Sequence, residues 1–447
     1  MHNPKDGNMK RVITAVTTVL LSGSLFAAEF DTKKLDELYS LIEKNNAGMG
    51  SVSIFKDGKE VYQRSIGYAD IEKKIRAKNN TRYRIGSISK TFTAVMLLQM
   101  VEAGKLSYST KISVYFPSIP NASRISVEHL LRHRSGLFNF TSLPDFGSWM
   151  FTPQSRAELL SRLSKLETIF QPGEKTEYSN TNYVLLSMIL EKVSGAAYAE
   201  LLQQRIVKPL KLRDTYYGGK IAEEKNAAYS YFKKGDWQKA PESDMSIPLG
   251  AGGIVSTPTD LNQFFSALFN GKLVSKQSLI HMKTLVDGLG MGLIEFPYYE
   301  QKVLGHNGII DGFQSNAGHF EDNNVTVSYI SNGTSMGVND ILIGTLNLYF
   351  GKPYEMPIFS AAIVVPTETL QLYVGTYSSP TFPLKIVIRI ENGVLVGQAT
   401  GQSAFPLEAY AEHMFRFDQA ALKIAFEPEN SVLILKQGGG EFRLTRE

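Results

Sequence analysis

The segment from Phe92 to Val101 is apolar on nearly every side of a helix, and this feature constrains the fold most strongly. A surface helix keeps one polar face, so a helix without such a face has to be buried among other elements. The sequence predicts this helix over residues 87–103, with Ser87 as its N-cap residue and Gly86 as a hinge after a short extended segment. The chain is therefore expected to be organised around one buried central helix.

Ser87 and Lys90 stand three residues apart at the start of this helix. Residues with this spacing share a helix face, so the amine of Lys90 can reach the hydroxyl of Ser87. The first-turn amides favour an anion beside the serine, and burial lowers the pKa of the lysine towards that of a useful base. The pair is a candidate acyl-transfer nucleophile with its base. The structural alternative is an N-cap serine beside a solvated lysine, a combination that is frequent by chance.

Size and charge limit the possible classes of protein. With 447 residues and 43% hydrophobic composition, the chain is long enough for a large core and one smaller domain. Lysine and arginine number 47 against 43 acidic residues, and no basic run or basic stripe with interleaved aromatics occurs. Nucleic acid is therefore not an expected partner. The sequence leaves the oligomeric state open.

The N-terminal residues predict a secretory signal peptide over residues 1–28. Lys10 and Arg11 precede an apolar segment that ends in the small residues Ala27 and Ala28, where we expect cleavage. The apolar run is shorter than the ~20 residues that a membrane span needs. The chain has no cysteine, which excludes disulfides and lipid attachment through a cysteine. We expect an exported protein, periplasmic or secreted, without a stable membrane anchor after cleavage.

The apolar patterns predict an α+β fold, in which one antiparallel sheet is flanked by helices and a helical subdomain is inserted between its strands. Strands are expected at both ends of a long helical middle, namely over 51–55, 61–62, 291–296, 302–306, 316–320 and 325–331. Helices are expected after Asp31 and over 125–131, 156–166, 182–193, 197–206 and 338–349.

Three regions are expected after the signal peptide. Residues 29–351 form the α+β domain, with the active site at the junction of sheet and helices. Residues 352–366 contain three prolines and are interpreted as a linker. Residues 367–447 alternate short strands with turns, which predicts a small all-β, barrel-like domain.

Two further motifs carry candidate functional residues. Tyr178-Ser179-Asn180 precedes a helix, where a phenol can enter a cleft and a nearby lysine can stabilise its phenolate as a proton acceptor. The alternative is a helix cap beside a packing tyrosine. Gly305-His306-Asn307-Gly308 is expected at the end of a strand, where glycines let a substrate lie as an added strand. The alternative is a β-turn with an exposed histidine.

The order Ser-x-x-Lys, Tyr-Ser-Asn and His-x-Gly resembles the penicillin-binding-protein-type serine hydrolases, which include class C β-lactamases, D,D-peptidases, D-aminopeptidases and related esterases. The resemblance covers about residues 35–350. It implies that Ser87 is acylated, while Lys90 and Tyr178 share general-base and general-acid work. Water then hydrolyses the acyl-enzyme, and no cofactor is implied.

The resemblance also implies a set of substrate-binding residues. Asn180 would hydrogen-bond the substrate or the catalytic lysine, and His306 would line the substrate with Gly308 beside it. The backbone amides of Ser87 and Ile309 would form the oxyanion hole.

One residue departs from the pattern of β-lactamases and D,D-peptidases, which usually carry lysine where this chain has His306. A histidine is largely neutral near pH 7 and is a weaker partner for a substrate carboxylate. This favours esters, amides or peptides with D-residues, possible peptidoglycan fragments among them, over β-lactams and terminal D-Ala-D-Ala. A β-lactamase or D,D-carboxypeptidase proper is therefore the second choice.

Other classes remain as alternatives. Gly333-Thr334-Ser335-Met336-Gly337 fits the nucleophile elbow of an α/β-hydrolase, although the upstream middle is helical rather than a series of βαβ units. A non-catalytic receptor for β-lactams or peptidoglycan on the same scaffold would typically have lost a catalytic residue. A metal enzyme is disfavoured, because His129 and His133 have helical spacing without the intervening glutamate that such sites use.

Overall fold

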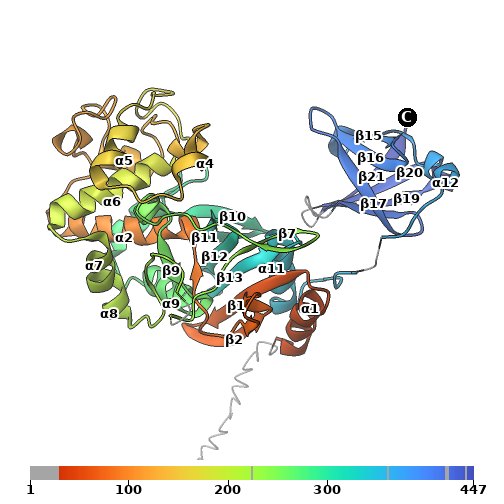
Figure 1. The fold of residues 1–447 in the computed structure, drawn as a ribbon, viewed down its shortest axis with the longest axis horizontal. Coiled ribbons are helices and arrows are strands. Elements are labelled where there is room, and N and C mark those ends of the chain that lie inside the picture. Colours follow the sequence, from red (N-terminus) through yellow and green to blue (C-terminus); the bar gives the residue numbers. More distant parts are fainter. Residues whose placement is uncertain (1–29, 223–224, 360–361, 418–421, 438–439) are drawn as a thin grey trace, which may run out of the picture.

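The computed structural model describes residues 30–222, 225–359, 362–417, 422–437 and 440–447. It consists of an α+β domain followed by a separate all-β domain (Figure 1). The expected signal peptide lies outside the described residues. Across the described ranges, no helix is both long and apolar enough to cross a membrane.

A six-stranded antiparallel sheet forms the framework of the first domain, in the order β10-β11-β12-β13-β1-β2. The N-terminal hairpin therefore completes a sheet whose other strands come from residues 294–334. The strands are β1 (Gly48–Lys56), β2 (Lys59–Ile66), β10 (Ile294–Tyr298), β11 (Gln301–Ile310), β12 (Phe313–Phe320) and β13 (Val325–Thr334).

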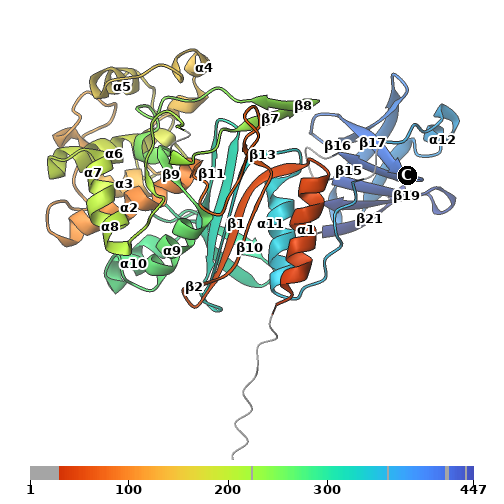
Figure 2. The same ribbon diagram turned by 60° about the horizontal axis from the view of Figure 1, so that its bottom comes forward.

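Helices cover both faces of this sheet. Figure 2 shows α1 (Thr32–Lys44) and α11 (Val338–Tyr349) side by side on one face, with α9 (Pro258–Phe269) on the other. Asp31 caps α1 by accepting a hydrogen bond from the Lys33 amide, as its position before an apolar helix predicts. The buried apolar faces of α1 and α11 close a core of their own against the sheet.

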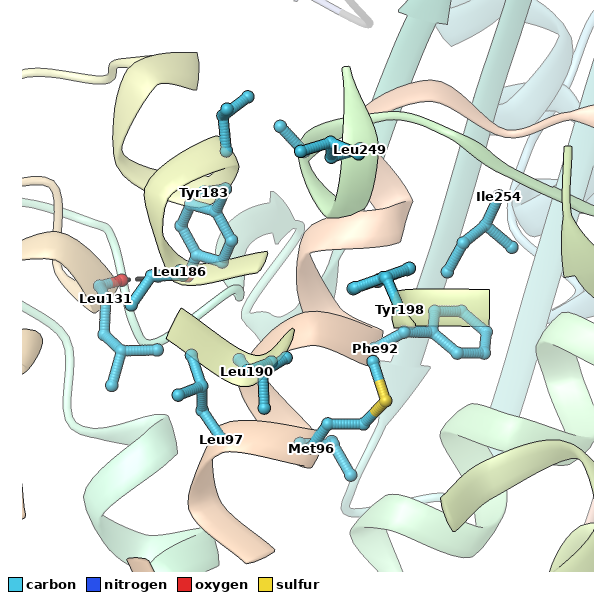
Figure 3. Packing of buried hydrophobic residues seen from close by; sticks show 14 of the residues in the cluster. Phe92, Met96, Leu97, Leu131, Tyr183, Leu186, Leu190, Tyr198, Leu249 and Ile254 are labelled. Atoms are coloured by element: carbon cyan, nitrogen blue, oxygen red, sulfur yellow. Dashed lines mark hydrogen bonds between the residues drawn. The ribbon is translucent and has the colours of Figure 1, made fainter. Parts of the chain in front are cut away.

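The helical subdomain is inserted between the two groups of strands. At its centre lies α2 (Ser89–Glu102), which is buried over nearly its whole length. Figure 3 shows Phe92, Met96 and Leu97 of this helix surrounded by apolar side chains of neighbouring segments. The remaining helices of the α+β domain are α3 (Val127–Leu131), α4 (Phe146–Trp149), α5 (Arg156–Leu163), α6 (Asn180–Ser194), α7 (Tyr198–Leu202), α8 (Lys208–Leu210) and α10 (Lys276–Lys283).

Smaller elements connect the subdomain to the sheet. One of them, the short three-stranded sheet β5-β9-β6, leads directly into the segment that carries Ser87. These elements are β3 (Tyr68–Asp70), β4 (Ile75–Arg76), β5 (Tyr83–Arg84), β6 (Tyr216–Tyr217), β7 (Tyr231–Lys234), β8 (Asp236–Lys239) and β9 (Ile254–Ser256).

The C-terminal domain is a closed barrel of eight antiparallel strands, in which β14 pairs with β21 to complete the circle. A short helix, α12 (Thr367–Gln371), precedes it, and buried aromatic and aliphatic side chains fill its interior. The strands are β14 (Gly375–Ser379), β15 (Phe382–Glu391), β16 (Val394–Ala399), β17 (Phe405–Ala411), β18 (Met414–Phe417), β19 (Leu422–Glu427), β20 (Val432–Gln437) and β21 (Gly440–Arg446).

The predicted fold class is confirmed, both for the α+β core and for the barrel. The predicted strand 291–296 begins three residues too early, because β10 occupies Ile294–Tyr298. The predicted strand 302–306 is too short, since β11 continues to Ile310. Because of this extension, the motif from Gly305 to Gly308 lies within a strand and not at its end.

Candidate active site

Ser87 lies in the 3₁₀ turn η1 (Gly86–Ile88), between β5 and α2. The prediction that Ser87 is the N-cap of the central helix is wrong, because its side chain makes no capping hydrogen bond and α2 begins two residues later. The turn is possible because Gly86 adopts φ +50°, in the left-handed region that favours glycine. The hydroxyl of Ser87 is therefore free to meet Lys90 instead of a backbone amide.

Lys90 is fully buried, and three groups surround its amine. Its Nζ lies 2.8 Å from Ser87 Oγ, 2.8 Å from Asn180 Oδ1 and 2.7 Å from the carbonyl oxygen of Ala251. Burial shifts the pKa of Lys90 well below its usual value. The carbonyl of Ala251 and Oδ1 of Asn180 only accept hydrogen bonds, so they use both N–H groups of a neutral amine. In that protonation state the lone pair of the amine is left to accept from the hydroxyl of Ser87, whereas a protonated amine donates to Ser87 Oγ.

Asn180 is the first residue of α6, and each end of its side chain has a partner. Oδ1 accepts from Lys90, Nδ2 donates to Thr141 Oγ1 at 3.1 Å, and the backbone amide donates to Asn139 Oδ1 at 3.0 Å. These contacts fix the amide orientation. Lys90, one of the two partners that the family resemblance implies for Asn180, lies within hydrogen-bond distance of it.

Tyr178 lies among ring systems beside the amine. Its ring stacks on His133 with centroids 4.4 Å apart, and Lys90 Nζ is 4.9 Å from its centroid. Burial raises the pKa of Tyr178, and a hydrogen bond with the Ser87 side chain only partly offsets this. The raised pKa of Tyr178 disfavours the phenolate that the sequence analysis considered, because Lys90, which was expected to stabilise it, has itself a lowered pKa. A protonated phenol at this position can donate a proton.

The motif from Gly305 to Gly308 lies inside β11, not at a strand end. Its pairing with β10 stops where Ile294 meets Gly305, so residues 306–310 expose one edge towards η1. This edge meets the turn that carries Ser87. A substrate backbone could hydrogen-bond to such an edge as an added strand.

Gly308 permits an unusually close approach between β11 and the turn. A Cβ atom at this position would lie 2.2 Å from the carbonyl oxygen of Ile85 and 2.8 Å from the amide nitrogen of Ser87. A Cβ atom on Gly86 would likewise lie 2.9 Å from the amide nitrogen of Ile309. The two glycines thus bring the Ser87 and Ile309 backbones together, as a two-amide oxyanion hole requires.

His306 is buried, with 2% of its surface exposed, so the alternative of an exposed histidine on a β-turn is wrong. Its Nδ1 lies 2.6 Å from the carbonyl oxygen of Asn307 and donates to it. Burial, with the nearby Lys90, lowers the pKa of His306 to about 3. The ring is 6.2 Å from that of Tyr178 and carries no charge at neutral pH.

A pocket of about 270 Å³ opens beside Ser87. Ser87, Asn180 and Ile309 lie on its wall, and neither lysine nor arginine lines it. Its other lining residues are mainly apolar, namely Phe140, Phe146, Met150, Ile247, Pro248, Ala251, Gly252 and Ile310, together with Thr141, Ser243 and Asp311. An apolar pocket with a few convergent polar groups is typical of a small-molecule binding site.

A buried ion pair supports this pocket, and the sequence analysis missed it. Arg84 Nη1 donates to Asp311 Oδ2 at 2.7 Å, and the Oδ1 atom of Asp311 accepts from the amide and hydroxyl of Ser243. Both charged side chains are almost fully buried. The pair joins Arg84, which lies three residues before Ser87, to Asp311, which directly follows β11. Its partners are 227 residues apart, so no local sequence signal marks it.

The alternative sites do not assemble. Ser335 follows β13 of an antiparallel sheet, and its hydroxyl donates to the carbonyl of Ala47 at 3.2 Å. The fold therefore contradicts an α/β-hydrolase elbow, which needs a parallel sheet. His133 accepts from the Ser179 amide at 3.1 Å and so positions the Tyr178 segment. Among the described residues, no group of three or more His, Asp or Glu side chains could hold a metal ion.

The fold and this arrangement define a class of protein, the serine hydrolases whose serine is followed by lysine at the start of a buried helix. Comparison with known proteins agrees, since the β-lactamase family model matches residues 39–347. The chain belongs to the β-lactamase family and is a serine hydrolase of that family.

Three relatives illustrate the range of the family. The chain is 27% identical to penicillin-binding protein 4* of Bacillus subtilis, over 93% of this chain and 98% of the relative. It resembles the octameric penicillin-binding protein homologue from Pyrococcus abyssi, with a TM-score of 0.67 and 26% identity over 92% and 99% of the two chains. D-amino acid amidase from Ochrobactrum anthropi SV3 gives a TM-score of 0.63 and 27% identity over 71% and 98%.

Replacement of Gly308 by alanine tests the close approach of β11 to the turn. The added Cβ would meet the carbonyl of Ile85 and push the Ile309 amide away from Ser87. Loss of one oxyanion donor typically lowers kcat by about 10²- to 10³-fold, and we expect a loss of that order in steady-state ester hydrolysis. Gly147→Ala is the matched control, because a Cβ there meets no atom within 4 Å. Equal activity of both variants would contradict this role of Gly308.

Proposed function

We propose that the protein hydrolyses amides or esters of D-amino acid residues through an acyl-enzyme on Ser87. The observation that carries this proposal is the environment of Lys90, whose amine faces Ser87 Oγ at 2.8 Å while two acceptors occupy its N–H groups. A buried neutral amine in this position is a base for the serine hydroxyl.

The first half of the reaction follows from these contacts. Lys90 accepts the proton of Ser87 as its oxygen attacks the substrate carbonyl. The amides of Ser87 and Ile309 stabilise the oxyanion, with each such donor typically worth about 3 kcal/mol of barrier. Tyr178 donates its proton to the departing amine or alcohol and regains one from protonated Lys90.

Hydrolysis of the acyl-enzyme reuses the same groups. A water molecule attacks the ester carbon of acylated Ser87 and gives a proton to Lys90. The bond to Ser87 Oγ then breaks, and the serine oxygen recovers the proton from the lysine. The enzyme returns to its starting protonation state, with a carboxylic acid as the product.

The charge of the site favours substrates without a carboxylate next to the scissile bond. In the proposed reaction Tyr178 protonates the leaving group, and His306 lies beside Tyr178 with a pKa of about 3, which leaves it neutral. A leaving group with a terminal carboxylate would lose solvation there without gaining a cationic partner. Similarity to D-amino acid amidase supports the amide of a D-residue as the substrate.

Labelling of the nucleophile is the first experiment. We expect intact-mass spectrometry to find a single fluorophosphonate adduct on the wild-type protein and on Ser335→Ala, and none on Ser87→Ala. The Ser335 variant is the matched control, because that hydroxyl donates to the backbone carbonyl of Ala47. Labelling that persists in Ser87→Ala would overturn the proposed nucleophile.

A matched pair of substrates tests the preference for uncharged leaving groups. N-acetyl-D-alanyl-D-alanine and its C-terminal amide differ only in the carboxylate. We expect kcat/KM for cleavage between the two residues, followed by the release of D-alanine or D-alaninamide, to be at least about tenfold higher for the amide, because a desolvated carboxylate beside a neutral histidine has no partner. His306→Lys should reduce this ratio. A wild-type preference for the free acid would contradict the proposed substrate class.

The lowered pKa of Lys90 predicts the pH dependence of acylation. The amine accepts a proton only when it is neutral, so kcat/KM should fall as pH decreases through the pKa of Lys90. Because burial lowers that pKa, the plateau should be reached well below the usual range of lysine. Stopped-flow acylation between about pH 5 and about pH 10 measures the profile. Activity retained in Lys90→Arg, whose guanidinium stays protonated, would argue against this base.

A further inference from the structure

The turn η6 (Leu249–Ala251) carries one of the two acceptors of the Lys90 amine, the carbonyl oxygen of Ala251. Neither the sequence motifs nor the proposed reaction explains what holds this turn in place. Leu249 adopts φ +43°, in the left-handed region that a side chain of this size rarely enters. Such a backbone conformation persists only where the surrounding contacts determine it, and strain of this kind is frequent at active sites.

Two side chains of α2 hold the segment that contains the turn. Ser89 and Thr93 lie four residues apart and therefore share a helix face, and both are fully buried. The hydroxyl of Ser89 accepts from the amide of Ile254 at 3.1 Å, and that of Thr93 donates to the carbonyl of Gly250 at 2.8 Å. The carbonyl that faces the lysine lies between these two attachment points in the sequence. The helix that carries the base therefore also fixes one acceptor of that base.

Tyr198 determines the direction in which the Thr93 hydroxyl donates. The hydroxyls of these two residues lie 2.7 Å apart, and both side chains are buried. The Thr93 hydroxyl has a single hydrogen, and its oxygen lies closer to the carbonyl of Gly250 than to that of Ser89, at 2.8 against 3.2 Å. With that hydrogen directed at Gly250, Thr93 accepts from Tyr198. The tyrosine thus keeps the Thr93 hydrogen on the turn.

A third hydroxyl connects the same turn to α6. Ser187 accepts from the Gly250 amide at 2.9 Å and donates to the carbonyl of Tyr183 at 2.6 Å. Asn180, the other acceptor of the Lys90 amine, begins the same helix. The turn is therefore joined both to the helix of the base and to the helix of the second acceptor.

Gly250 is the residue at which these hydroxyl groups meet. A Cβ atom there would lie within 2.6 Å of Thr93 Oγ1, Ser187 Oγ and Tyr198 Cε2. Glycine is the residue that allows three buried side chains to approach the backbone this closely. The strained turn is thus enclosed by hydroxyl groups from three helices.

We propose that Thr93 is a positioning residue of the reaction and that Ser187 assists it. Their hydroxyls hold the turn so that the Ala251 carbonyl occupies one N–H group of Lys90 and the amine stays directed at Ser87. A displaced turn would let the amine rotate away from the serine or would admit water beside it, and general-base catalysis depends on this geometry. The inference rests on the proposed role of Lys90 as the base.

Removal of the Thr93 hydroxyl tests the proposal. For Thr93→Val we expect kcat on the p-nitrophenyl ester of N-acetyl-D-alanine to fall about tenfold or more, with KM within about twofold of the wild-type value, because a displaced base weakens only the transition state. Thr93→Ser keeps the hydroxyl and should restore kcat to within about threefold of the wild-type value. A role in stability alone would not separate kcat from KM in this way.

Thr345 provides a matched control, because it makes the same kinds of contact away from the site. It is fully buried in α11, its hydroxyl lies 2.7 Å from that of Tyr39, and it donates to the carbonyl of Ile341 at 2.7 Å. Thr345→Val therefore removes equivalent hydrogen bonds. We expect this variant to lose thermal stability, as Thr93→Val does, but to keep the kcat and KM of the wild type.

Ser187→Ala is the second variant, and it decides the question if Thr93→Val does not fold. Loss of the hydrogen bond to the Gly250 amide should lower kcat about threefold to tenfold with KM unchanged, since one bond is removed in place of two. If the wild type is labelled at Ser87 but does not hydrolyse the ester, the same comparisons are made on the rate of fluorophosphonate labelling.

Three outcomes would overturn the inference. They are a folded Thr93→Val variant with wild-type kcat, an equal loss of kcat in Thr345→Val, and a Thr93→Ser variant as slow as Thr93→Val. Wild-type kcat in Ser187→Ala has the same meaning if Thr93→Val does not fold. Failure of the proposed function is distinguishable, because the wild-type protein would then not be labelled at Ser87, or Lys90→Arg would remain active.

Discussion

The burial of one amine is the interaction on which the rest of the structure depends. Lys90 is fully buried, and its amine makes hydrogen-bond contacts with the serine, an amide oxygen and a backbone carbonyl. Water around this amine would restore its ordinary pKa and its charge. The mostly apolar surface of α2 thus serves the chemistry as well as the packing, because the helix that carries the base has to exclude water.

A second constraint is the contact between two parts of the chain that are far apart in sequence. The turn η1 precedes the helical subdomain, whereas β11 belongs to the sheet. Gly86 and Gly308 allow the backbones of these two segments to come into contact, and the buried Arg84–Asp311 ion pair joins the same two segments. Removal of one partner from such a buried pair typically costs about 3–5 kcal/mol, because the other charge is left unpaired. Stability and site geometry are therefore coupled here.

Locally encoded features of the site could be predicted from the sequence. The contact between Ser87 and Lys90 follows from helical spacing, and the position of Asn180 follows from its place at a helix start. The 3₁₀ turn and the length of β11 could not be predicted, since tertiary contacts decide them. The Arg84–Asp311 pair and the raised pKa of Tyr178 depend on burial by segments that are distant in sequence, and the spacing of residues along the chain does not indicate such burial.

The free edge of β11 between residues 306 and 310 has a stereochemical consequence. A substrate that lies along this edge has its backbone direction and register fixed by hydrogen bonds, and successive side chains then point to opposite faces of the sheet. At a given register, exchanging the side chain and the hydrogen on one Cα turns an L-residue into its mirror image and directs the side chain to the other face. The strand edge can thus discriminate handedness by which face offers room, without any contact to the chiral centre itself.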